Sequence, residues 1–386
     1  MTAPLLVVGA GFAGFWAAVA ASRVLDGAVP VTLVAPSPVL QLRPRLYQAR
    51  PETLGLELRP LLAQVGVGYL AATAIGIDAA ASQLPLEDDK RLPFTRLVVA
   101  TGSVMRRPPI LGADLALSID TQAEAIVVDQ RLRALALADA SPRIVVVGAG
   151  FTGLELVLAL RDRLDAHRPG AGNHAQLTLV DRGAWPGQAL GEGPRAAIAD
   201  ALAAAAVHLR MGAAVAAITP HGLTLDGGEA IAADLVLLST GMVAAGFSRQ
   251  VPSTHDALGR VQVDVDLRAP AAPAVFVIGD AAAADTGDGH LALQSCQHAL
   301  QLGRVAGENA ALDLLGRPTR AYAQPRYVTC LDLGRSGAVF TEGWDRVLVD
   351  AGAAMGQRKR DINEVVIYPP VGADRDALLA ASRTST

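Results

Sequence analysis

Cysteine and lysine are both scarce in this chain of 386 residues. The two cysteines, Cys296 and Cys330, form no CxxC or CxxxxC pattern, which excludes a disulfide-rich secreted scaffold and an obvious redox dithiol. Lysine occurs only at Lys90 and Lys359, and with a formal net charge of −4 the chain has no long-range positive field to attract nucleic acid. We therefore expect a protein of a reducing, cytoplasmic compartment that binds no nucleic acid, and we find no pattern typical of a metal site.

A long uninterrupted apolar run is also missing, although residues 4–21 come close to one. Glycines at positions 9, 11 and 14 break this stretch and no basic residue precedes it, so it predicts a strand, a turn and a helix rather than a membrane span or a signal peptide. Hydrophobic residues make up 51% of the chain and glycine is frequent, which is typical of an α/β protein whose parallel strands are buried on both faces.

One segment of the sequence occurs twice. Each copy has the pattern of an apolar strand, a GAGFxG turn and an apolar helix. The first copy is LLVVGAGFAGFWAAVAA at residues 5–21, and the second is IVVVGAGFTGLELVLAL at residues 144–160. Each copy is followed by a second strand, VTLVAPS (31–37) or LTLVDRG (177–183), and then by a strand that runs into a Thr-Gly turn, LVVATGS (97–103) or LVLLSTGM (235–242). The repeat predicts two Rossmann-like units in one chain.

The glycines of each turn have distinct physical tasks in binding a dinucleotide. Gly9 permits the tight turn, Gly11 lets the backbone approach a pyrophosphate, and Gly14 lets the helix pack closely on the strand. The second copy repeats this spacing at Gly148, Gly150 and Gly153. The helix after each turn presents free N–H groups and the positive end of its dipole to the phosphates. A tight turn without a ligand is the alternative, and two copies with matching downstream strands argue against it.

The two copies differ at the end of their second strand. Asp181 closes that strand in the second copy, where a carboxylate can accept hydrogen bonds from the ribose hydroxyls of NADH. The 2′-phosphate of NADPH would face like charge there, at a cost of roughly 1–4 kcal/mol for two unit charges about 4 Å apart. Arg182 next to it would soften that preference. The first copy carries Ala35 instead, which suits a resident ligand that is held through its phosphates and rings and rarely leaves.

A third signal, VFVIGDAAAA at residues 275–284, has no counterpart in the repeat. Together with the glycine turns it resembles the flavoproteins with two dinucleotide-binding domains, the pyridine nucleotide-disulfide oxidoreductase-like superfamily, in which this GD motif binds the ribityl chain of FAD. Two further stretches are similar to the type II NADH dehydrogenases. These are LQLRPRLYQA (40–49) and CQHALQLG (296–303), which matches the quinone-site motif AQxAxQxG except that Cys296 replaces the first alanine. The resemblance covers residues 1 to about 320 and implies FAD and NADH as cofactors, with NADPH less expected.

The resemblance also assigns residues to roles. Glu155, Gln297 and Gln301 are implied as catalytic residues, the glutamate near the nicotinamide and flavin, and the two amides on one helical face toward a flat acceptor. The implied cofactor-binding residues are Gly9, Gly11, Phe12, Ala13, Gly14, Arg45, Thr101, Gly102, Gly148, Gly150, Gly153, Asp181, Gly241, Gly279, Asp280, Gln297 and His298. Alternatives stay open: a helix face that packs against another domain for the two glutamines, a structural role for Glu155, and a surface or interface position for His298.

These signals predict an α/β fold with two Rossmann-like domains, in which the flavin domain is interrupted by the nicotinamide domain. The expected parts are residues 1–115 (FAD-binding, first part), 116–245 (NAD(P)H-binding), 246–320 (FAD-binding, second part) and 321–386 (a small C-terminal region).

The sequence thus predicts an FAD-dependent NADH oxidoreductase that passes hydride from NADH to FAD and electrons on to a quinone or other small acceptor. Rival interpretations are a reductase of a small redox protein, a flavin monooxygenase or other tailoring enzyme, and a non-enzymatic FAD/NADH redox sensor. A sulfide-oxidising relative is not expected because no cysteine pair lies between residues 40 and 180. A homodimer stays open. QRKRD (357–361) is the best surface candidate for weak contact with anionic lipid at the inner face of a membrane, but it has no evident apolar face, so a solvated helix is the favoured interpretation.

Overall fold

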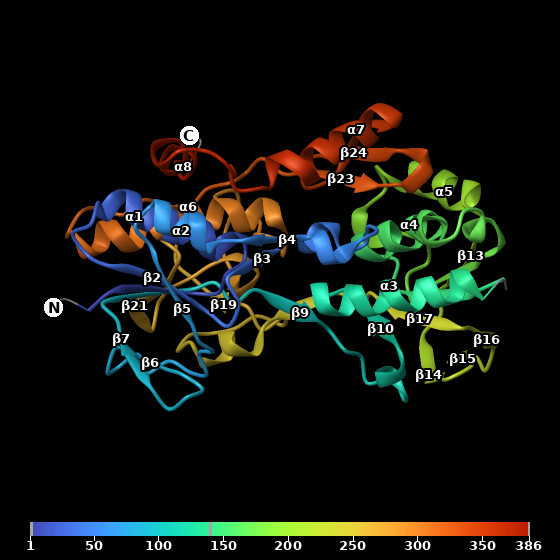
Figure 1. The fold of residues 1–386 in the computed structure, drawn as a ribbon, viewed down its shortest axis with the longest axis horizontal. Helices are drawn as coiled ribbons and strands as arrows, with labels where there is room; N and C mark the ends of the chain where they lie inside the picture. The colour runs from blue at the N-terminus through green and yellow to red at the C-terminus, as the bar shows by residue number, and fades with distance from the viewer. Residues whose placement is uncertain (1–2, 139–140, 385–386) are drawn as a thin grey trace.

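The structure is a computed structural model that describes residues 3–138 and 141–384. Two α/β lobes lie side by side, and the C-terminal region runs along one edge of both (Figure 1). The first lobe is on the left in Figure 1 and contains the beginning of the chain together with α6, while the second lobe is on the right and contains the middle of the chain.

The first lobe is built on a six-stranded sheet that is parallel except for one edge strand. In spatial order its strands are β20 (Arg268–Ala269), β21 (Ala272–Val277), β8 (Arg96–Val99), β1 (Leu5–Val8), β2 (Val31–Ala35) and β5 (Gly68–Ala71). The central strand β1 has the sequence LLVV and is buried along its whole length, as expected for a parallel strand covered on both faces.

Two helices of the first lobe pack on each other unusually closely. These are α1 (Phe12–Leu25) and α6 (Cys296–Leu314), which lie side by side above the sheet in Figure 1. A Cβ at Gly303 would lie 2.4 Å from the carbonyl oxygen of Ala13, and a Cβ at Gly307 would lie 2.1 Å from that of Ala17. The two helix backbones can approach only because α6 has glycine at both positions.

The second lobe is built on a five-stranded parallel sheet. Its strands are, in spatial order, β10 (Leu117–Ser118), β17 (Leu235–Leu238), β11 (Arg143–Val147), β12 (Gln176–Asp181) and β13 (Val207–Met211). Its helices are α3 (Gln122–Leu137), α4 (Phe151–His167) and α5 (Arg195–Ala204). A capping box of Thr121 and Glu124 fixes the start of α3, because each side chain bonds the backbone N–H of the other residue.

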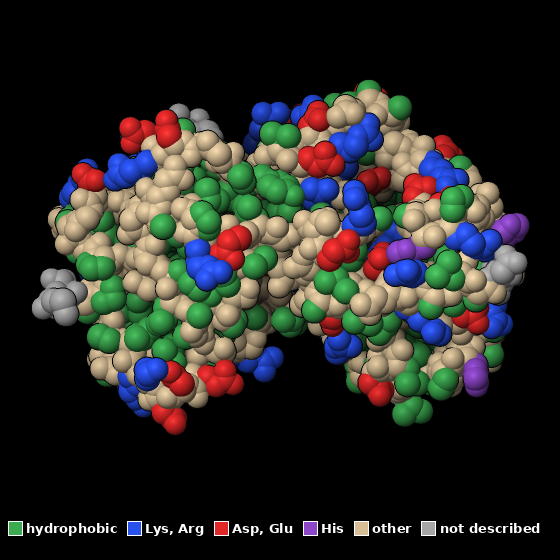
Figure 2. Space-filling model, in the orientation of Figure 1, with side chains coloured by type: hydrophobic (Ala, Val, Ile, Leu, Met, Phe, Trp, Pro, Cys, Tyr) green, Lys and Arg blue, Asp and Glu red, His purple; other side chains and the backbone are tan. Residues whose placement is uncertain are grey.

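The chain crosses between the lobes twice, and the two crossings pair with each other. β9 (Ser103–Met105) leads into the second lobe and β18 (Met242–Ala244) leads back, and together they form an antiparallel ribbon. Figure 2 shows the two lobes separated by a broad hollow below this ribbon.

The C-terminal region contacts both lobes. Its elements are β23 (Val328–Asp332), β24 (Ala338–Glu342), β25 (Val347–Gly352), α7 (Ala353–Asp361), a π-helical turn (Ile362–Val366) and α8 (Arg375–Ala381). β23 lies against α4 of the second lobe, and α8 lies against α1 of the first. The remaining strands and the short helix α2 are β3 (Val39–Gln41), β4 (Gly55–Glu57), α2 (Arg59–Gln64), β6 (Gln83–Pro85), β7 (Arg91–Pro93), β14 (Val215–Thr219), β15 (Gly222–Leu225), β16 (Ala230–Ala232), β19 (Val261–Gln262) and β22 (Ala282–Ala283).

The expected α/β architecture with two Rossmann-like lobes and parallel sheets is confirmed. The apolar stretch near the N-terminus forms β1, a turn and α1, as the glycines predicted. Within residues 3–138 and 141–384, no helix combines the length and the apolarity needed to cross a membrane.

The close packing of α1 and α6 gives a direct test. Gly307→Ala places a methyl group against the Ala17 carbonyl, which belongs to a helix backbone and cannot move aside, so we expect a loss of about 1–3 kcal/mol in stability. Thermal unfolding followed by circular dichroism measures it. Gly227→Ala is the control, because a Cβ there would meet nothing within 4 Å and should leave the midpoint nearly unchanged.

Candidate active site

The first glycine turn leaves a backbone cradle at the start of α1. Gly9 has a φ of +114°, and a Cβ there would lie 2.3 Å from the carbonyl oxygen of Ala100 at the end of β8. A Cβ at Gly14 would lie 1.9 Å from the carbonyl oxygen of Gly9, whereas a Cβ at Gly11 would meet nothing within 4 Å. The outer glycines are therefore needed for packing, and the middle one opens the backbone toward space that suits a pyrophosphate.

The GD motif lies against this turn. Gly279 and Asp280 begin the short 3-10 helix η7 (Gly279–Ala281), and a Cβ at Gly279 would lie 3.0 Å from Cβ of Ala13. The hydroxyl of Ser103 donates to the Asp280 carboxylate, with 2.5 Å between Oγ and Oδ2. Burial raises the pKa of Asp280, and the hydrogen bond from Ser103 opposes that rise. A polyol chain with several hydroxyl donors fits such a carboxylate.

Thr101 supplies a second observation at the same place. It follows β8, two residues before Ser103, and its Oγ1 is buried without a hydrogen-bond partner among the residues that the structure describes. A buried hydroxyl normally has a partner. The orphaned hydroxyl beside the glycine turn and the GD motif therefore fits a polar ligand such as the ribityl and pyrophosphate part of FAD.

The second glycine turn repeats the cradle in the other lobe. Gly148 has a φ of +112°, and a Cβ there would lie 2.0 Å from the carbonyl oxygen of Ser239. A Cβ at Gly153 would lie 1.8 Å from the carbonyl oxygen of Gly148, and a Cβ at Gly150 would meet nothing within 4 Å. Helix α4 begins at the next residue, Phe151. Two cradles of the same shape fit two dinucleotides.

Asp181 braces the second turn with both of its carboxylate oxygens. Oδ2 accepts from the backbone N–H of Ala149 at 2.7 Å, and Oδ1 accepts from that of Gly183 at 2.6 Å. A carboxylate has about four lone-pair positions, so it retains acceptor capacity for ribose hydroxyls. In the first lobe the matching residue, Ala35, is buried, and its carbonyl accepts from the hydroxyl of Tyr69 at 2.8 Å. Only the second lobe has a carboxylate here.

The other residues predicted to bind a cofactor lie in three places. Phe12 is buried in the first turn of α1, while Gly102 and Gly241 follow β8 and β17 with φ values of +71° and +86°. The polar contacts of Arg45 are to Gln48 (2.9 Å) and to the C-terminal segment, where it donates to the Tyr368 hydroxyl at 2.9 Å and lies 3.6 Å from Glu364. A flavin contact for Arg45 stays a prediction.

Glu155 forms a buried ion pair that the sequence did not reveal. It lies on α4, one turn beyond the second cradle, and its Oε1 is 2.8 Å from Nζ of Lys359 on α7. The two side chains are 5% and 7% exposed. Oε1 of Glu155 also accepts from the backbone N–H of Asp332 at 3.1 Å, and Lys359 donates to the Cys330 carbonyl at 3.0 Å. Helix α4 of the second lobe is thereby fixed to two elements of the C-terminal region.

The surroundings of this ion pair bring the pKa of the Glu155 carboxyl close to neutral pH. Burial raises the pKa of Glu155 to about 7, and the positive charge of Lys359 limits the rise. Burial alone would lower the pKa of Lys359, but the Glu155 carboxylate outweighs it and the pKa is raised. Lys359 therefore keeps its proton at neutral pH while Glu155 can gain or lose one.

A hydrogen-bonded chain continues from the ion pair to the first lobe. Asp332 accepts from the hydroxyl of Tyr47 at 2.7 Å, and Asn363 donates to the same hydroxyl at 3.3 Å. Burial, and then the negative charge of Glu155, raises the pKa of Tyr47, so its proton stays on. The stretch around Tyr47, which resembles the type II NADH dehydrogenases, thus meets the C-terminal region at the Glu155 carboxyl.

Residues 357–361 do not present all three of their basic side chains to the surface, as both a lipid contact and a fully solvated helix would require. Lys359 is turned inward and is 6% exposed, because it neutralises Glu155. Arg358 lies over the ring of Phe340, with its Cζ 4.1 Å from the ring centre. Arg360 donates to Gln357 on its own helix. Only two of the three charges reach the surface, and both already have partners.

The start of α6 carries the residues predicted to meet an acceptor. Gln297 and Gln301 are half-buried, and the Gln297 amide donates to the Arg326 carbonyl at 3.3 Å. The alternative of a surface position for His298 is wrong, because its side chain is fully buried. Burial lowers the pKa of His298 to about 4, so the ring is neutral, and it makes a 2.9 Å contact with the hydroxyl of the helix cap Ser295. The Nε2 atom of His298 has no partner among the described residues.

Four stacked rings connect His298 to the surface, and no local pattern in the sequence predicted them. Tyr327 stacks on His298 with 5.6 Å between ring centres, Trp344 on Tyr327 at 4.7 Å, and the exposed His290 on Trp344 at 4.5 Å. The indole N–H of Trp344 donates to Asp288 at 3.0 Å. These rings cover the start of α6 with an apolar wall made by a loop of the first lobe and by the β24–β25 hairpin.

Comparison with known proteins agrees with this geometry. Residues 3–303 match the model of the pyridine nucleotide-disulphide oxidoreductase family. The chain belongs to this family. An NADH dehydrogenase-like protein of Mycobacterium tuberculosis is 40% identical over 98% of the chain and 97% of its own length. The demethylphylloquinone reductase of Synechocystis is 28% identical over 87% of the chain and 86% of its own length. The structure of sulfide:quinone oxidoreductase from Aquifex aeolicus superposes with a TM-score of 0.76 at 16% identity, covering 94% of this chain and 90% of that one, and shows the shared fold.

Within this family member the predicted residues separate into three groups. The first glycine turn, the GD motif and the start of α6 lie together, because Gly279 and Gly303 both pack against Ala13. The second glycine turn and Asp181 lie together in the other lobe. Glu155 lies with the C-terminal region. Its partner Lys359 is a functional candidate that the sequence did not indicate, because a lysine between two arginines suggests a solvated run of charges rather than one residue on the inner face of a helix.

The Glu155–Lys359 pair predicts a pH-dependent stability. Lys359→Met removes the cation that limits the pKa of Glu155, so the folded-state pKa rises further above the unfolded value. Such a carboxyl favours folding below its unfolded pKa, and the contribution is lost as pH rises through the folded pKa. We therefore expect the deficit in unfolding free energy of Lys359→Met to be larger at pH 8 than at pH 5 by up to about 1.4 kcal/mol, because only the one pH unit between the wild-type pKa of about 7 and pH 8 contributes.

The double variant Glu155→Gln/Lys359→Met is the control for this test. It contains neither charge, so its stability relative to wild type should lack the extra loss at pH 8. Thermal unfolding at both pH values measures all three proteins, and an equal deficit of the single variant at pH 5 and pH 8 would contradict the assignment.

Proposed function

We propose that this chain is an FAD-dependent NADH oxidoreductase that delivers electrons to a quinone-like acceptor. The observation that carries the proposal is the pair of glycine cradles, of which only the second has a carboxylate at the end of its second strand. When bound, FAD would accept hydride from NADH and release electrons to the acceptor. The Synechocystis relative is named for reduction of demethylphylloquinone, which supports a quinone-like acceptor.

The first lobe would bind FAD as a resident cofactor, whereas the second lobe would bind NADH as a substrate that exchanges in each cycle. The first lobe would hold the FAD pyrophosphate at Gly11 and the start of α1, and the ribityl hydroxyls at Asp280 and Thr101. The second lobe would hold NADH at Gly150, with the ribose hydroxyls at Asp181. A carboxylate favours the two hydroxyls of NADH over the 2′-phosphate of NADPH by roughly 1–4 kcal/mol.

Glu155 would exchange the protons that a quinone-like acceptor takes up with its electrons. Its carboxyl has a pKa of about 7, so both protonation states are populated near neutral pH. Lys359 would hold the deprotonated form in place, and Asp332 and Tyr47 would connect it toward the first lobe.

The start of α6 would orient the acceptor. The bond from Gln297 to the Arg326 carbonyl is long at 3.3 Å, so an acceptor carbonyl can replace it at small cost. One helical turn further, Gln301 would donate to the same flat molecule. The stacked rings of His298, Tyr327 and Trp344 would keep water away from this end of the helix.

The deciding experiment is anaerobic stopped-flow mixing of the purified yellow protein with NADH or NADPH, followed by mixing with a soluble quinone, oxygen or ferricyanide. We expect bleaching of the flavin by NADH faster than by NADPH, and reoxidation fastest with the quinone. A purified protein that binds no FAD after reconstitution would contradict the proposal.

Variants at α6 separate the two half-reactions. Gln297→Ala and Gln301→Ala each remove one donor to the acceptor, and a lost hydrogen bond of about 1–1.5 kcal/mol corresponds to roughly tenfold slower reoxidation by quinone. Reduction by NADH should be nearly unchanged. Gln176→Ala, at the exposed start of β12, is the matched control and should change neither rate.

A further inference from the structure

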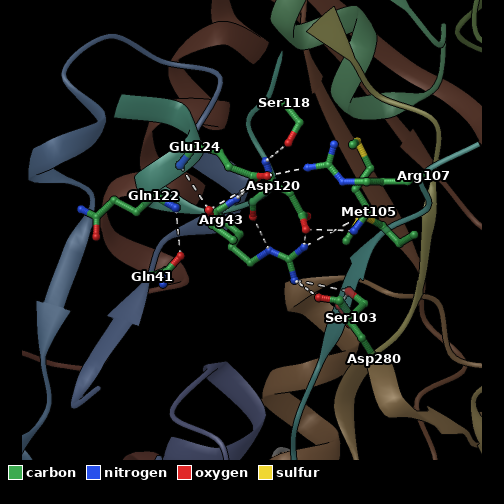
Figure 3. Close-up of polar contacts among 12 residues, drawn as sticks. Gln41, Arg43, Ser103, Met105, Arg107, Ser118, Asp120, Gln122, Glu124 and Asp280 are labelled. Carbon is green, nitrogen blue, oxygen red and sulfur yellow. Dashed lines mark hydrogen bonds and ion pairs between the residues drawn. The ribbon is translucent and has the colours of Figure 1, made fainter. Parts of the chain in front are cut away.

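The guanidinium of Arg43 lies where the two lobes meet. Arg43 begins a short 3-10 helix, η1 (Arg43–Arg45), in the first lobe, and Figure 3 shows its side chain pointing at the crossing into the second lobe. It pairs with the Asp120 carboxylate, donates to the Asp120 carbonyl at 3.1 Å, and donates to the Ser103 carbonyl at 3.0 Å. Its other neighbour is the sulfur of Met242, at 3.9 Å.

These contacts join both crossings and the start of the second lobe. Ser103 is the first residue of β9, Met242 is the first residue of β18, and Asp120 lies just before the helix α3. The second oxygen of the Asp120 carboxylate accepts from the backbone N–H of Met105 at 2.9 Å. The planar guanidinium of Arg43 therefore fixes the relative positions of four segments, which are η1, β9, β18 and the residues just before α3.

The pair is sheltered from solvent. The Arg43 side chain is 32% exposed and that of Asp120 is 11% exposed. Screening by salt is weaker for such a pair than for ion pairs at the surface. By contrast, Arg107, on the same crossing segment, is 54% exposed and pairs with Glu124 at 3.0 Å.

The contacts of Arg43 also reach the GD carboxylate. The Ser103 hydroxyl, which lies 3.3 Å from the Arg43 guanidinium, donates to Asp280 at 2.5 Å (Figure 3). The segment just before Arg43 also contacts the second lobe, because the side-chain oxygen of Gln41 accepts a hydrogen bond from the backbone N–H of Gln122 at 3.0 Å. The flavin side and the nicotinamide side of the molecule thus share one polar network.

We propose that Arg43 is a positioning residue that sets the angle between the two lobes, and so the distance between the bound nicotinamide and the flavin. The inference rests on the proposed function. Hydride transfer needs the reacting atoms about 3–3.5 Å apart, and a misplacement of about 1 Å costs on the order of 100-fold in rate. The chain passes between the lobes through the two short strands β9 and β18, and Arg43 contacts the first residue of each, so its guanidinium is placed to restrain the angle between the lobes.

The test compares Arg43→Gln, Arg43→Lys and Asp120→Asn with wild-type holoprotein. In stopped-flow reduction by NADH we expect the limiting rate to fall at least about tenfold in Arg43→Gln, while the dissociation constant for NADH changes less than about threefold, because the cradle and Asp181 are untouched. Arg43→Lys should recover little of the rate, since one ammonium cannot reach Asp120 and Ser103 in the same geometry. Reoxidation should be unchanged.

Limited proteolysis supplies a readout that does not depend on turnover. Subtilisin should cut the crossing segments of Arg43→Gln and Asp120→Asn severalfold faster than those of wild type. Arg107→Gln is the matched control and should resemble wild type in both measurements.

The outcomes separate this inference from the proposed function. A wild-type protein that NADH does not reduce contradicts the proposed function, and the proteolysis comparison then decides alone whether Arg43 restrains the lobes. Loss of NADH affinity in proportion to rate, or rates and cleavage equal to those of wild type, would overturn the inference. If Arg43→Gln does not fold, Arg43→Lys and Asp120→Asn answer the same question.

Discussion

The buried ion pair of Glu155 and Lys359 holds the C-terminal region on the second lobe. Removing two charges from water costs several kcal/mol per ion, and this is offset only when the pair is close and its other donors and acceptors are satisfied. Here Glu155 also accepts from Asp332 and Lys359 donates to Cys330. The pair and these two hydrogen bonds therefore fix the relative positions of three elements, namely helix α4, strand β23 and helix α7. Breaking such a pair typically costs 3–5 kcal/mol. The same burial raises the pKa of Glu155 to about 7 while Lys359 limits that rise, so this carboxyl can change its protonation state near neutral pH.

Local features of the sequence predicted each lobe well. The three glycines of a turn lie within six residues, and the two outer ones are required by the backbone that approaches them, as Gly9 and Gly14 show. Lys359 could not be found in this way. It lies between Arg358 and Arg360, and a run of charges is usually solvated, but on a helix one of three neighbours can face inward. Its partner on α4 is 204 residues away by number (359 − 155), and no local pattern records that contact. For His298 the sequence left a surface and an interface position open, and only the structure decides for the interface, because the covering rings come from Tyr327 and Trp344.

The hairpin of β24 and β25 also joins the two lobes. Its contacts lie far from those of Arg43 in the sequence and differ from them in chemistry. Trp344 at its tip stacks on His290 of the first lobe, and Arg346 donates to the Ala189 carbonyl of the second. A Cβ at Gly193 would lie 1.9 Å from the Arg346 carbonyl, so the second lobe can accept the tip only with glycine there. At the tip, a ring stack and a charged donor add to the apolar packing that holds the rest of the C-terminal region.

The junction between the lobes combines apolar packing with directional polar contacts, because one cluster of buried apolar residues has members in both lobes and in the C-terminal region. Within each lobe, apolar strands are buried on both faces, and burial of that kind is non-directional and tolerant of exchange. Directional contacts of Arg43 between the lobes, and of Glu155 and Trp344 between a lobe and the C-terminal region, add to this apolar packing. Directional contacts specify angle and distance more sharply than apolar burial does. A reaction in which hydride passes between ligands on separate lobes depends on that angle and distance, so the residues hardest to foresee from the sequence are the ones on which such a reaction depends most.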